Sequence, residues 1–175
     1  ESPCPSASLH ERVLPAVIAD VSHSLPKRCV EGWAGTGVLT QKLALCSFEV
    51  RAYEVRPALG GDRLEIEDGD LEREEVRDEC ITDINTGQVY YTHWSFPCSS
   101  WTPFSNFCGT TRSGEEPLGD GTQERERKGN EQAAITVWFV MACIISGVFF
   151  SLEHPVKSRF WCLPLVVFLM SLAGM

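Results

Sequence analysis

Residues 133–152, AAITVWFVMACIISGVFFSL, form a long stretch without a single charged side chain. Such a stretch has to be removed from water, and it is long enough to span a lipid bilayer. The alternative is a buried helix followed by a buried strand, because Gly147 interrupts the stretch and the aromatic and β-branched residues after it favour a strand. The chain is therefore either a membrane protein or a domain with a buried central strand.

The composition fits one globular domain with a hydrophobic core. Of the 175 residues, 43% are hydrophobic and 22% are charged, and the formal net charge is −9. A surface this acidic does not attract a polyanion as a basic nucleic-acid binder does. Any contact with a nucleic acid would have to be local or supplied by another chain.

The cysteines predict a reducing compartment and no metal site. There are eight of them, and they form no CxxC pair and no Cys/His cluster with zinc spacing. We expect mostly buried free thiols in an intracellular protein, nuclear or cytoplasmic. The first residues have no apolar signal segment and no initial methionine, so we expect a clipped or partial chain.

A strand, a glycine turn, a helix and a second strand follow one another early in the chain. RCVEGWAG predicts a strand that runs into the turn, VLTQKLALC has the apolar spacing of a helix, and FEVRAYEV predicts a strand that ends in Glu54. This order is a βαβ unit, which builds parallel sheets. Over the whole chain we predict strands near 28–33, 49–54, 62–66, 87–96 and 147–152, and helices near 7–24, 37–46, 71–80, 131–146 and 158–171.

The turn WAGTG, residues 33–37, favours a nucleoside-containing cofactor. Its glycines let the backbone approach a ligand closely, and the following helix offers free N–H groups. A dinucleotide fingerprint would read GxGxxG, but Thr40 stands at the third glycine, so S-adenosylmethionine fits better than a diphosphate. Glu54 is placed to accept both hydroxyls of a ribose. The alternative is an ordinary tight turn with a surface glutamate.

Two further residues are candidates for chemistry. Cys98 follows a predicted strand, where side chains face the crevice in which parallel sheets bind ligands, so we interpret it as a nucleophile rather than core filler. Glu153 ends the next strand and would lie beside Cys98 in that crevice. Next to buried aromatic side chains its pKa would be raised, and it could donate a proton to a ring nitrogen. The alternative is a solvated loop glutamate.

Taken in order, these residues resemble the DNA (cytosine-5) methyltransferases. The segment from WAGTG to YEVRP is similar to that family's opening glycine motif, first helix and second acidic strand end; DGDL is similar to its adenine-contacting motif, FPCSSWTPFS to its Pro-Cys motif and SLEHP to its Glu-Asn motif. The segment from GNEQ to SRFW resembles a divergent branch. The similarity covers roughly residues 29–165. It implies S-adenosylmethionine as cofactor, held by Trp33, Ala34, Gly35, Thr36, Gly37, Glu54, Asp70, Leu71 and Pro97.

The resemblance also implies a fold and a domain organisation. The fold would be a Rossmann-like, three-layer α/β/α domain with a mostly parallel sheet. Residues 1–26 would form a flanking helix, and residues 27–175 a catalytic domain that ends before any target-recognition domain. It further implies that residues 133–152 are a core helix and strand rather than a membrane span.

The activity that the resemblance implies is methylation of cytosine at C5. In that chemistry Cys98 adds to C6 and makes C5 enamine-like, and Glu153 assists at N3. A cytosine in a duplex would first be flipped out of the stack. DNA is the substrate that the family implies, and RNA is possible.

The sequence departs from the family in three places. His154 replaces the usual asparagine, the family's Gln-x-Arg-x-Arg pattern does not follow Glu153, and the chain ends at Met175 without a recognition domain. We therefore expect that a recognition domain or a second chain is needed. A non-catalytic relic or cofactor-binding module of the same fold is the main alternative, and a protein with a C-terminal hydrophobic anchor is a further one.

Overall fold

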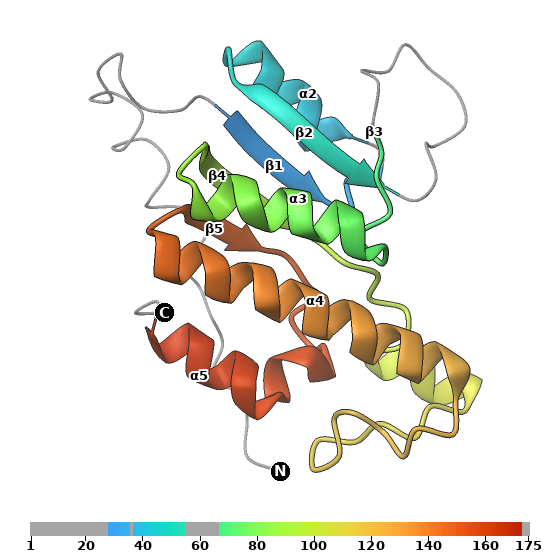
Figure 1. Ribbon diagram of the computed structural model, residues 1–175. Helices are drawn as coiled ribbons and strands as arrows, with labels where there is room; N and C mark the ends of the chain where they lie inside the picture. Colours follow the sequence, from blue (N-terminus) through green and yellow to red (C-terminus); the bar gives the residue numbers. More distant parts are fainter. Residues whose placement is uncertain (1–27, 36, 55–66, 173–175) are drawn as a thin grey trace.

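The computed structural model describes residues 28–35, 37–54 and 67–172 of the chain (Figure 1). The predicted helix at 7–24, with the flanking segment 1–26, and the predicted strand at 62–66 lie outside these residues. So does Thr36, one of the predicted cofactor-binding residues. The described residues form an α/β domain built on a parallel sheet, as the βαβ pattern predicts.

The sheet has five strands in the order β3-β2-β1-β4-β5, and each neighbouring pair is parallel. The strands are β1 Arg28–Gly32, β2 Glu49–Glu54, β3 Glu67–Asp68, β4 Val89–Trp94 and β5 Phe149–Leu152. The chain builds outward from β1 to β3 and then returns to the other side of β1. The strand order therefore reverses between β1 and β4, and open parallel sheets bind ligands at the carboxyl ends of strands beside such a reversal.

Helices cover both faces of the sheet. They are α2 Val38–Leu45, α3 Glu74–Asn85, α4 Glu124–Ser146 and α5 Pro164–Leu172, with short 3-10 helices η1 Pro103–Cys108 and η2 Arg159–Cys162. Figure 1 shows α3 and α4 side by side in front of the strands and α2 behind them. Right-handed crossovers require this arrangement, because the connections on the two sides of β1 run in opposite directions. The fold is compatible with a Rossmann-like domain.

The uncharged stretch 133–152 divides into a helix and a strand. Helix α4 ends at Ser146, Gly147 adopts the left-handed conformation with φ 67°, and β5 begins at Phe149. Strand β5 then pairs in parallel with β4, which is a central strand. In the part of the chain that the structure describes, no helix combines the length and the apolar character needed to cross a membrane. The predicted division into a helix and a strand is confirmed, but β5 lies at one edge of the described sheet and none of its residues is buried, so the prediction of a buried central strand is wrong.

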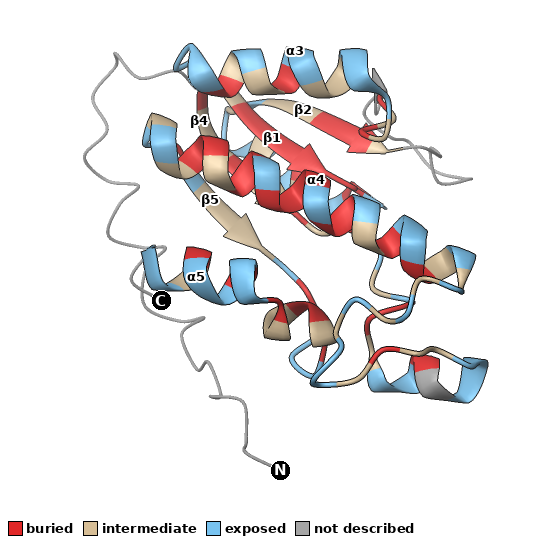
Figure 2. Ribbon diagram, turned by 60° about the horizontal axis from the view of Figure 1, so that its bottom comes forward, coloured by how far each residue is buried: buried red, intermediate tan, exposed pale blue. Residues whose placement is uncertain are grey.

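Helix α4 supplies the largest block of the hydrophobic core. The Phe139 ring stacks on Trp94 of β4 with ring centroids 4.4 Å apart, and both side chains are fully buried. Burying a side chain of this size contributes roughly 1.5–3 kcal/mol. Figure 2 shows the resulting stripe of buried residues along α4. This packing holds α4 at a fixed distance from the sheet. It also gives the loops at the carboxyl ends of the strands a rigid base.

Three helices differ from their predicted bounds, and α3 covers Glu74–Asn85 rather than 71–80. Helix α4 begins at Glu124, seven residues before the predicted start at 131, because two residues of its charged first turns, Glu126 and Gly129, are buried. The predicted helix at 158–171 is divided into η2 and α5. Leu163 is extended there, with φ −64° and ψ 127°, since the residue before a proline is sterically restricted to extended backbone.

Candidate functional site

The glycine turn after β1 is held by backbone hydrogen bonds. Ala34 N–H donates to Tyr53 O at 3.0 Å, which ties the turn to β2, and Gly37 N–H donates to Ala34 O at 2.8 Å. Gly35 and Gly37 have φ angles of 54° and 67°, which residues with a side chain rarely adopt. The two glycines are therefore required by the backbone, as the sequence predicts.

Trp33 lies in the same turn in an unfavourable backbone conformation. Its φ is 56°, in the left-handed region, which costs a residue other than glycine about 1–2 kcal/mol. Its ring is buried and meets the rings of Trp94 and Phe96 edge to face, with centroids 6.4 and 6.1 Å away. The aromatic contacts offset the backbone cost and hold one edge of the indole ring at the end of the sheet.

Glu31 is a functional residue that we did not predict. Its buried carboxylate, on β1, accepts a hydrogen bond from Thr40 N–H at 2.7 Å and a second one from the Thr40 hydroxyl. Gly37, the N-cap residue of α2, has no side chain to cap the helix, so Glu31 takes that role from the strand. The signal in the sequence was an acidic residue inside the otherwise apolar strand CVEG.

Glu54 lies where the sequence predicts, at the carboxyl end of β2. Its Oε2 accepts a hydrogen bond from Gly35 N–H at 2.9 Å, so the carboxylate braces the glycine turn. The same side chain lines a cleft at this edge of the sheet. A carboxylate in this place can accept hydroxyl donors of a bound ribose, as we expected from its position after the strand.

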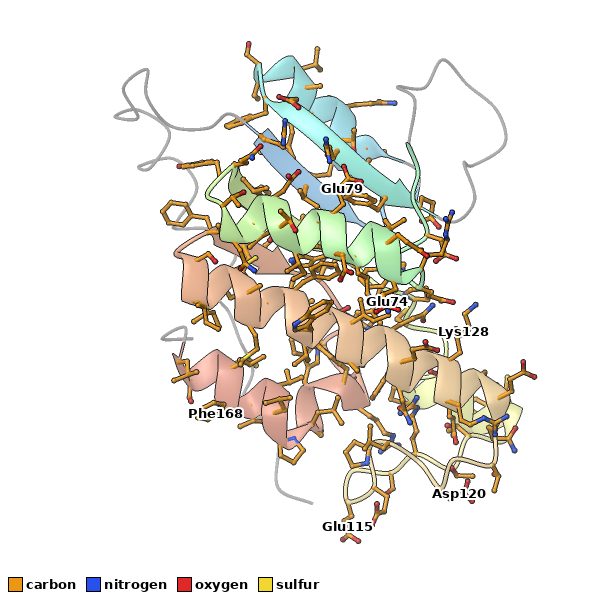
Figure 3. The ribbon with its side chains drawn as sticks, viewed as in Figure 1. Glu74, Glu79, Glu115, Asp120, Lys128 and Phe168 are labelled. Atoms are coloured by element: carbon orange, nitrogen blue, oxygen red, sulfur yellow. The ribbon has the colours of Figure 1, made fainter. Side chains whose placement is uncertain are left out.

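The predicted acidic motif after β3 is ordered. Asp70 accepts a hydrogen bond from Glu72 N–H at 2.8 Å, and Leu71 is buried. The Glu72 carboxylate reaches α4, where it accepts from Gln132 Nε2 at 2.8 Å and lies 3.4 Å from Lys128 Nζ. Figure 3 shows Lys128 leaving α4 toward the end of α3 that carries Glu74. These contacts join the segment between β3 and α3 to α4.

A cleft of about 350 Å³ opens at the carboxyl ends of the strands. This volume lies within the range of small-ligand sites. The described residues that line it are Trp33, Glu54, Glu72, Pro97, Ser99, Ser100, Arg125, Lys128, Gly129 and Gln132. Three of them were predicted from the sequence as cofactor-binding residues. The four from α4 were not predicted, and three of them, Arg125, Lys128 and Gly129, lie before residue 131, where the predicted helix begins.

Cys98 lies in the tight turn that leaves β4. Trp101 N–H donates to Cys98 O at 2.9 Å, which closes the turn, and the Trp101 ring is fully buried. Cys98 is half-buried, and its neighbours Pro97 and Ser99 both line the cleft, whereas Cys98 is not among the described lining residues. Cys98 therefore lies in the turn between two lining residues without itself being a described part of the cleft wall.

Glu153 differs from our expectation. We expected it beside buried aromatic side chains, but its side chain is 77% exposed and lies 3.7 Å from His93 Nε2. The imidazole of His93 has a lowered pKa because it is buried, although Glu31 and Glu153 oppose the shift. Glu153 is not among the described residues that line the cleft. The structure therefore does not bring Cys98 and Glu153 to a common cavity wall.

His154, the next residue, takes the buried position. Its ring lies 4.5 Å from Phe96 and 5.1 Å from Phe160, centroid to centroid, and neither ring nitrogen has a hydrogen-bond partner. Burial lowers the pKa of His154 to about 4, so the ring is neutral at physiological pH. An imidazole without hydrogen-bond partners cannot hold a loop by hydrogen bonds. The His154 ring instead packs among the neighbouring aromatic rings.

Neither a metal cluster nor a related protein identifies this site. Within the described ranges, no three His, Cys, Asp or Glu side chains are grouped so that they could hold a metal ion. Comparisons with protein-family models, with curated proteins and with solved structures found no match for this chain. Its function therefore has to be inferred from the cleft and from the residues around it.

Proposed function

We propose that the protein is an S-adenosylmethionine-dependent methyltransferase that acts on C5 of cytosine in a nucleic acid, with DNA as the first substrate to test. The observation that carries this proposal is the cleft at the reversal of strand order, lined by Trp33, Glu54 and Pro97. These residues follow or end three different strands, β1, β2 and β4; Glu54 was expected to bind a cofactor from its position, and Trp33 and Pro97 were expected to do so from the family resemblance.

The residues around the cleft suit a nucleoside cofactor. Glu54 would accept the ribose hydroxyls, and the segment Asp70–Leu71 would border the adenine. The glycine turn would offer backbone close to the ligand, with the N-terminus of α2 behind it. When bound, the cofactor would supply an electrophilic methyl group on a sulfonium. Lys128 and Glu72, which face each other across 3.4 Å, add one charge of each sign to the same wall.

The chemistry on the base would be carried by Cys98. Its thiolate would form a bond to C6 of the cytosine ring, which places electron density at C5. Glu153 would hydrogen-bond or protonate N3 and offset that charge. After C5 is methylated, a base removes the C5 proton and the bond between Cys98 and C6 breaks, which restores the ring. For this role the exposed Glu153 carboxylate has to swing from His93 toward the substrate.

A cofactor-binding module without catalysis is the second candidate. The observation that favours it is Glu153, which is 77% exposed and pairs with His93 rather than facing the cleft. In this alternative the cleft would still bind S-adenosylmethionine, and Cys98 would form no bond to a base. The two candidates therefore share cofactor binding and differ in the covalent step.

Cofactor binding is tested by titration calorimetry on the full chain. We expect S-adenosylmethionine to bind, and E54A to weaken binding by about tenfold or more because the ribose loses its acceptor. E49A is the matched control, since Glu49 lies at the opposite, amino end of β2. No binding by the wild-type chain, or equal binding by E54A, would overturn the proposal.

The covalent step is tested with an oligonucleotide that contains 5-fluorocytosine. With S-adenosylmethionine present, methyl transfer leaves C5 bearing fluorine and a methyl group but no proton, so a base cannot complete the elimination and a nucleophile bonded to C6 stays attached. At moderate salt, which screens the repulsion between an acidic protein and a polyanion, we expect a covalent adduct with wild-type protein and none with C98S. C46S, which changes an exposed cysteine at the C-terminal end of α2, should behave like wild type. Cofactor binding without an adduct would identify the non-catalytic module.

A further inference from the structure

Arg112 is a buried cation beside the Cys98 turn. Only 3% of its surface is exposed, whereas arginine is rarely buried unless it is paired. The guanidinium lies over the Trp101 ring, 3.6 Å from the ring centroid, as a cation–π contact. Burial lowers the pKa of Arg112 to about 10, with the Glu126 carboxylate opposing the shift, so the group stays charged at neutral pH.

The Arg112 side chain connects three separate segments. Nη2 donates to Ser100 Oγ in the Cys98 turn at 3.3 Å and to Glu126 O on α4 at 2.9 Å. Nη1 donates to Pro117 O in the loop before α4 and to Asn130 Oδ1 on α4, both at 2.7 Å. A planar guanidinium can satisfy these directions together, and a lysine ammonium cannot.

The turn and α4 touch directly at the same place. A Cβ atom on Gly129 would lie 2.4 Å from Ser100 Oγ and 3.1 Å from Arg112 Nη2, so no side chain fits there. Ser100 and Gly129 both line the cleft. Arg112 therefore joins the two walls of the cleft, and it does so two residues away from the candidate nucleophile.

We propose that Arg112 is a positioning residue: through Trp101 and Ser100 it fixes the turn that carries Cys98 against α4. This inference rests on the proposed function for its meaning in catalysis, but the placement of the thiol can be measured without any reaction. The turn is held by the directed hydrogen bonds of the planar guanidinium and by its stacking on the Trp101 ring. A lysine, which has the charge without this geometry, does not replace Arg112. Arg112 itself touches neither the thiol nor the substrate.

The test is the rate at which iodoacetamide alkylates each cysteine of the full chain, followed by mass spectrometry of peptides across a range of pH. In R112K and R112M we expect the alkylation rate at Cys98 to rise by about tenfold or more, because the turn opens locally. We also expect the pH dependence of that rate to shift. Cys46, which is exposed, provides the internal reference, and the fully buried Cys80 reports whether the core stays closed.

R127M is the matched control. Arg127 also donates from Nη1 to loop carbonyls, Gly121 O at 2.7 Å and Thr122 O at 3.1 Å, but its side-chain hydrogen bonds within the described residues do not reach the Cys98 turn. We expect wild-type alkylation at Cys98 in this variant. If R112M exposes Cys80 and so fails to fold, R112K decides. Wild-type rates and pH profile at Cys98 in R112K, or an equal change at Cys98 and Cys80 in R112K, would overturn the proposal.

Methyl transfer separates this inference from the proposed function. If the protein methylates cytosine, R112K should lower the transfer rate by about 100-fold, since a small misplacement of a reacting group has an effect of this size. If the wild-type chain binds no cofactor but the alkylation result holds, the proposed function fails and the positioning of Cys98 by Arg112 stands. If transfer occurs and R112K leaves both transfer and alkylation unchanged, the positioning fails and the function stands.

Discussion

The two sides of the turn that carries Cys98 are held by different kinds of contact. On the α4 side, Arg112 and Glu126 are buried charges: both terminal nitrogens of Arg112 donate hydrogen bonds and both carboxylate oxygens of Glu126 accept them, while Arg112 Nε has no partner among the described residues. On the η2 side, His154 packs among aromatic rings and both of its nitrogens lack partners. Hydrogen bonds fix distances and directions, while ring packing mainly fills space. The polar side therefore sets the geometry of the turn, and the aromatic side sets how firmly it is buried.

Glu126 shows how complete the polar side is. Its fully buried carboxylate accepts hydrogen bonds from Thr111 N–H at 2.6 Å, from the Thr111 hydroxyl at 2.8 Å and from the Thr110 hydroxyl. Burial raises the pKa of Glu126, but the hydrogen bonds from the two threonines outweigh that effect and hold the pKa below its ordinary value. The loop before α4 is thus pinned to the first turn of the helix.

The largest effect is expected from breaking the polar side. E126A leaves the donors of Thr110 and Thr111 without an acceptor and removes a charge near Arg112, so we expect a loss of about 3–5 kcal/mol in the free energy of unfolding. Urea unfolding followed by fluorescence measures this loss. The control is E124A, which changes an exposed residue two positions earlier in the first turn of α4 and should shift the urea midpoint very little. An equal loss of unfolding free energy in both variants would contradict the comparison.

The next effect is a pH dependence from the aromatic side. The pKa of His154 is about 4 in the folded chain and 6.5 ordinarily, so between these values the unfolded chain binds a proton that the folded chain does not. Stability should therefore fall as the pH drops from about 6.5 to about 4, by up to about 3 kcal/mol in total.

The control for this pH dependence is H154F, which keeps a ring and removes the titrating group. Its unfolding free energy should lose most of the slope between pH 6.5 and 4. The slope that remains reports other groups, among them His93, whose pKa is also lowered by burial. If wild type and H154F fall in parallel over this range, His154 is not a buried neutral ring.

The smallest effect is expected at neutral pH in the same variant. Phenylalanine fits among Phe96, Phe160 and Trp161 without leaving polar atoms unpaired, so H154F should raise the unfolding free energy by about 1 kcal/mol. Thermal unfolding at pH 7.5 measures the gain. A loss of stability instead would mean that the imidazole nitrogens have partners, and the aromatic side would then resemble the polar side.

The parts of the fold that depend on local chain chemistry were predictable. Gly147 divides the uncharged stretch into α4 and β5 because a left-handed residue ends a helix, and this preference is readable from one residue and its neighbours. The glycine turn and the carboxylate of Glu54 were predicted for the same kind of reason. The parallel sheet followed from the βαβ pattern.

The parts that depend on distant partners were not predictable. Arg112 and Glu126 lie in sequence segments with the polar composition of a surface loop. Only their contacts with Ser100, Thr110 and Thr111 show that they are buried. Glu31 likewise became meaningful only through Thr40. Three of the predicted cofactor residues line the cleft. The residues that α4 contributes to its wall were missed, because the charged first turns of α4 do not show the apolar spacing that predicts a helix. Glu153 was predicted beside buried aromatic side chains, but its neighbour His154 occupies that position and Glu153 is exposed.

Trp33 combines two requirements that conflict at a single position. Its left-handed backbone would be satisfied by glycine, while its indole forms part of the cleft wall. Directed evolution for heat resistance would therefore tend to accept smaller residues there, and each accepted change would erode ligand affinity. Retention of tryptophan in a stabilised library would be a sign that selection had acted on binding as well as on folding.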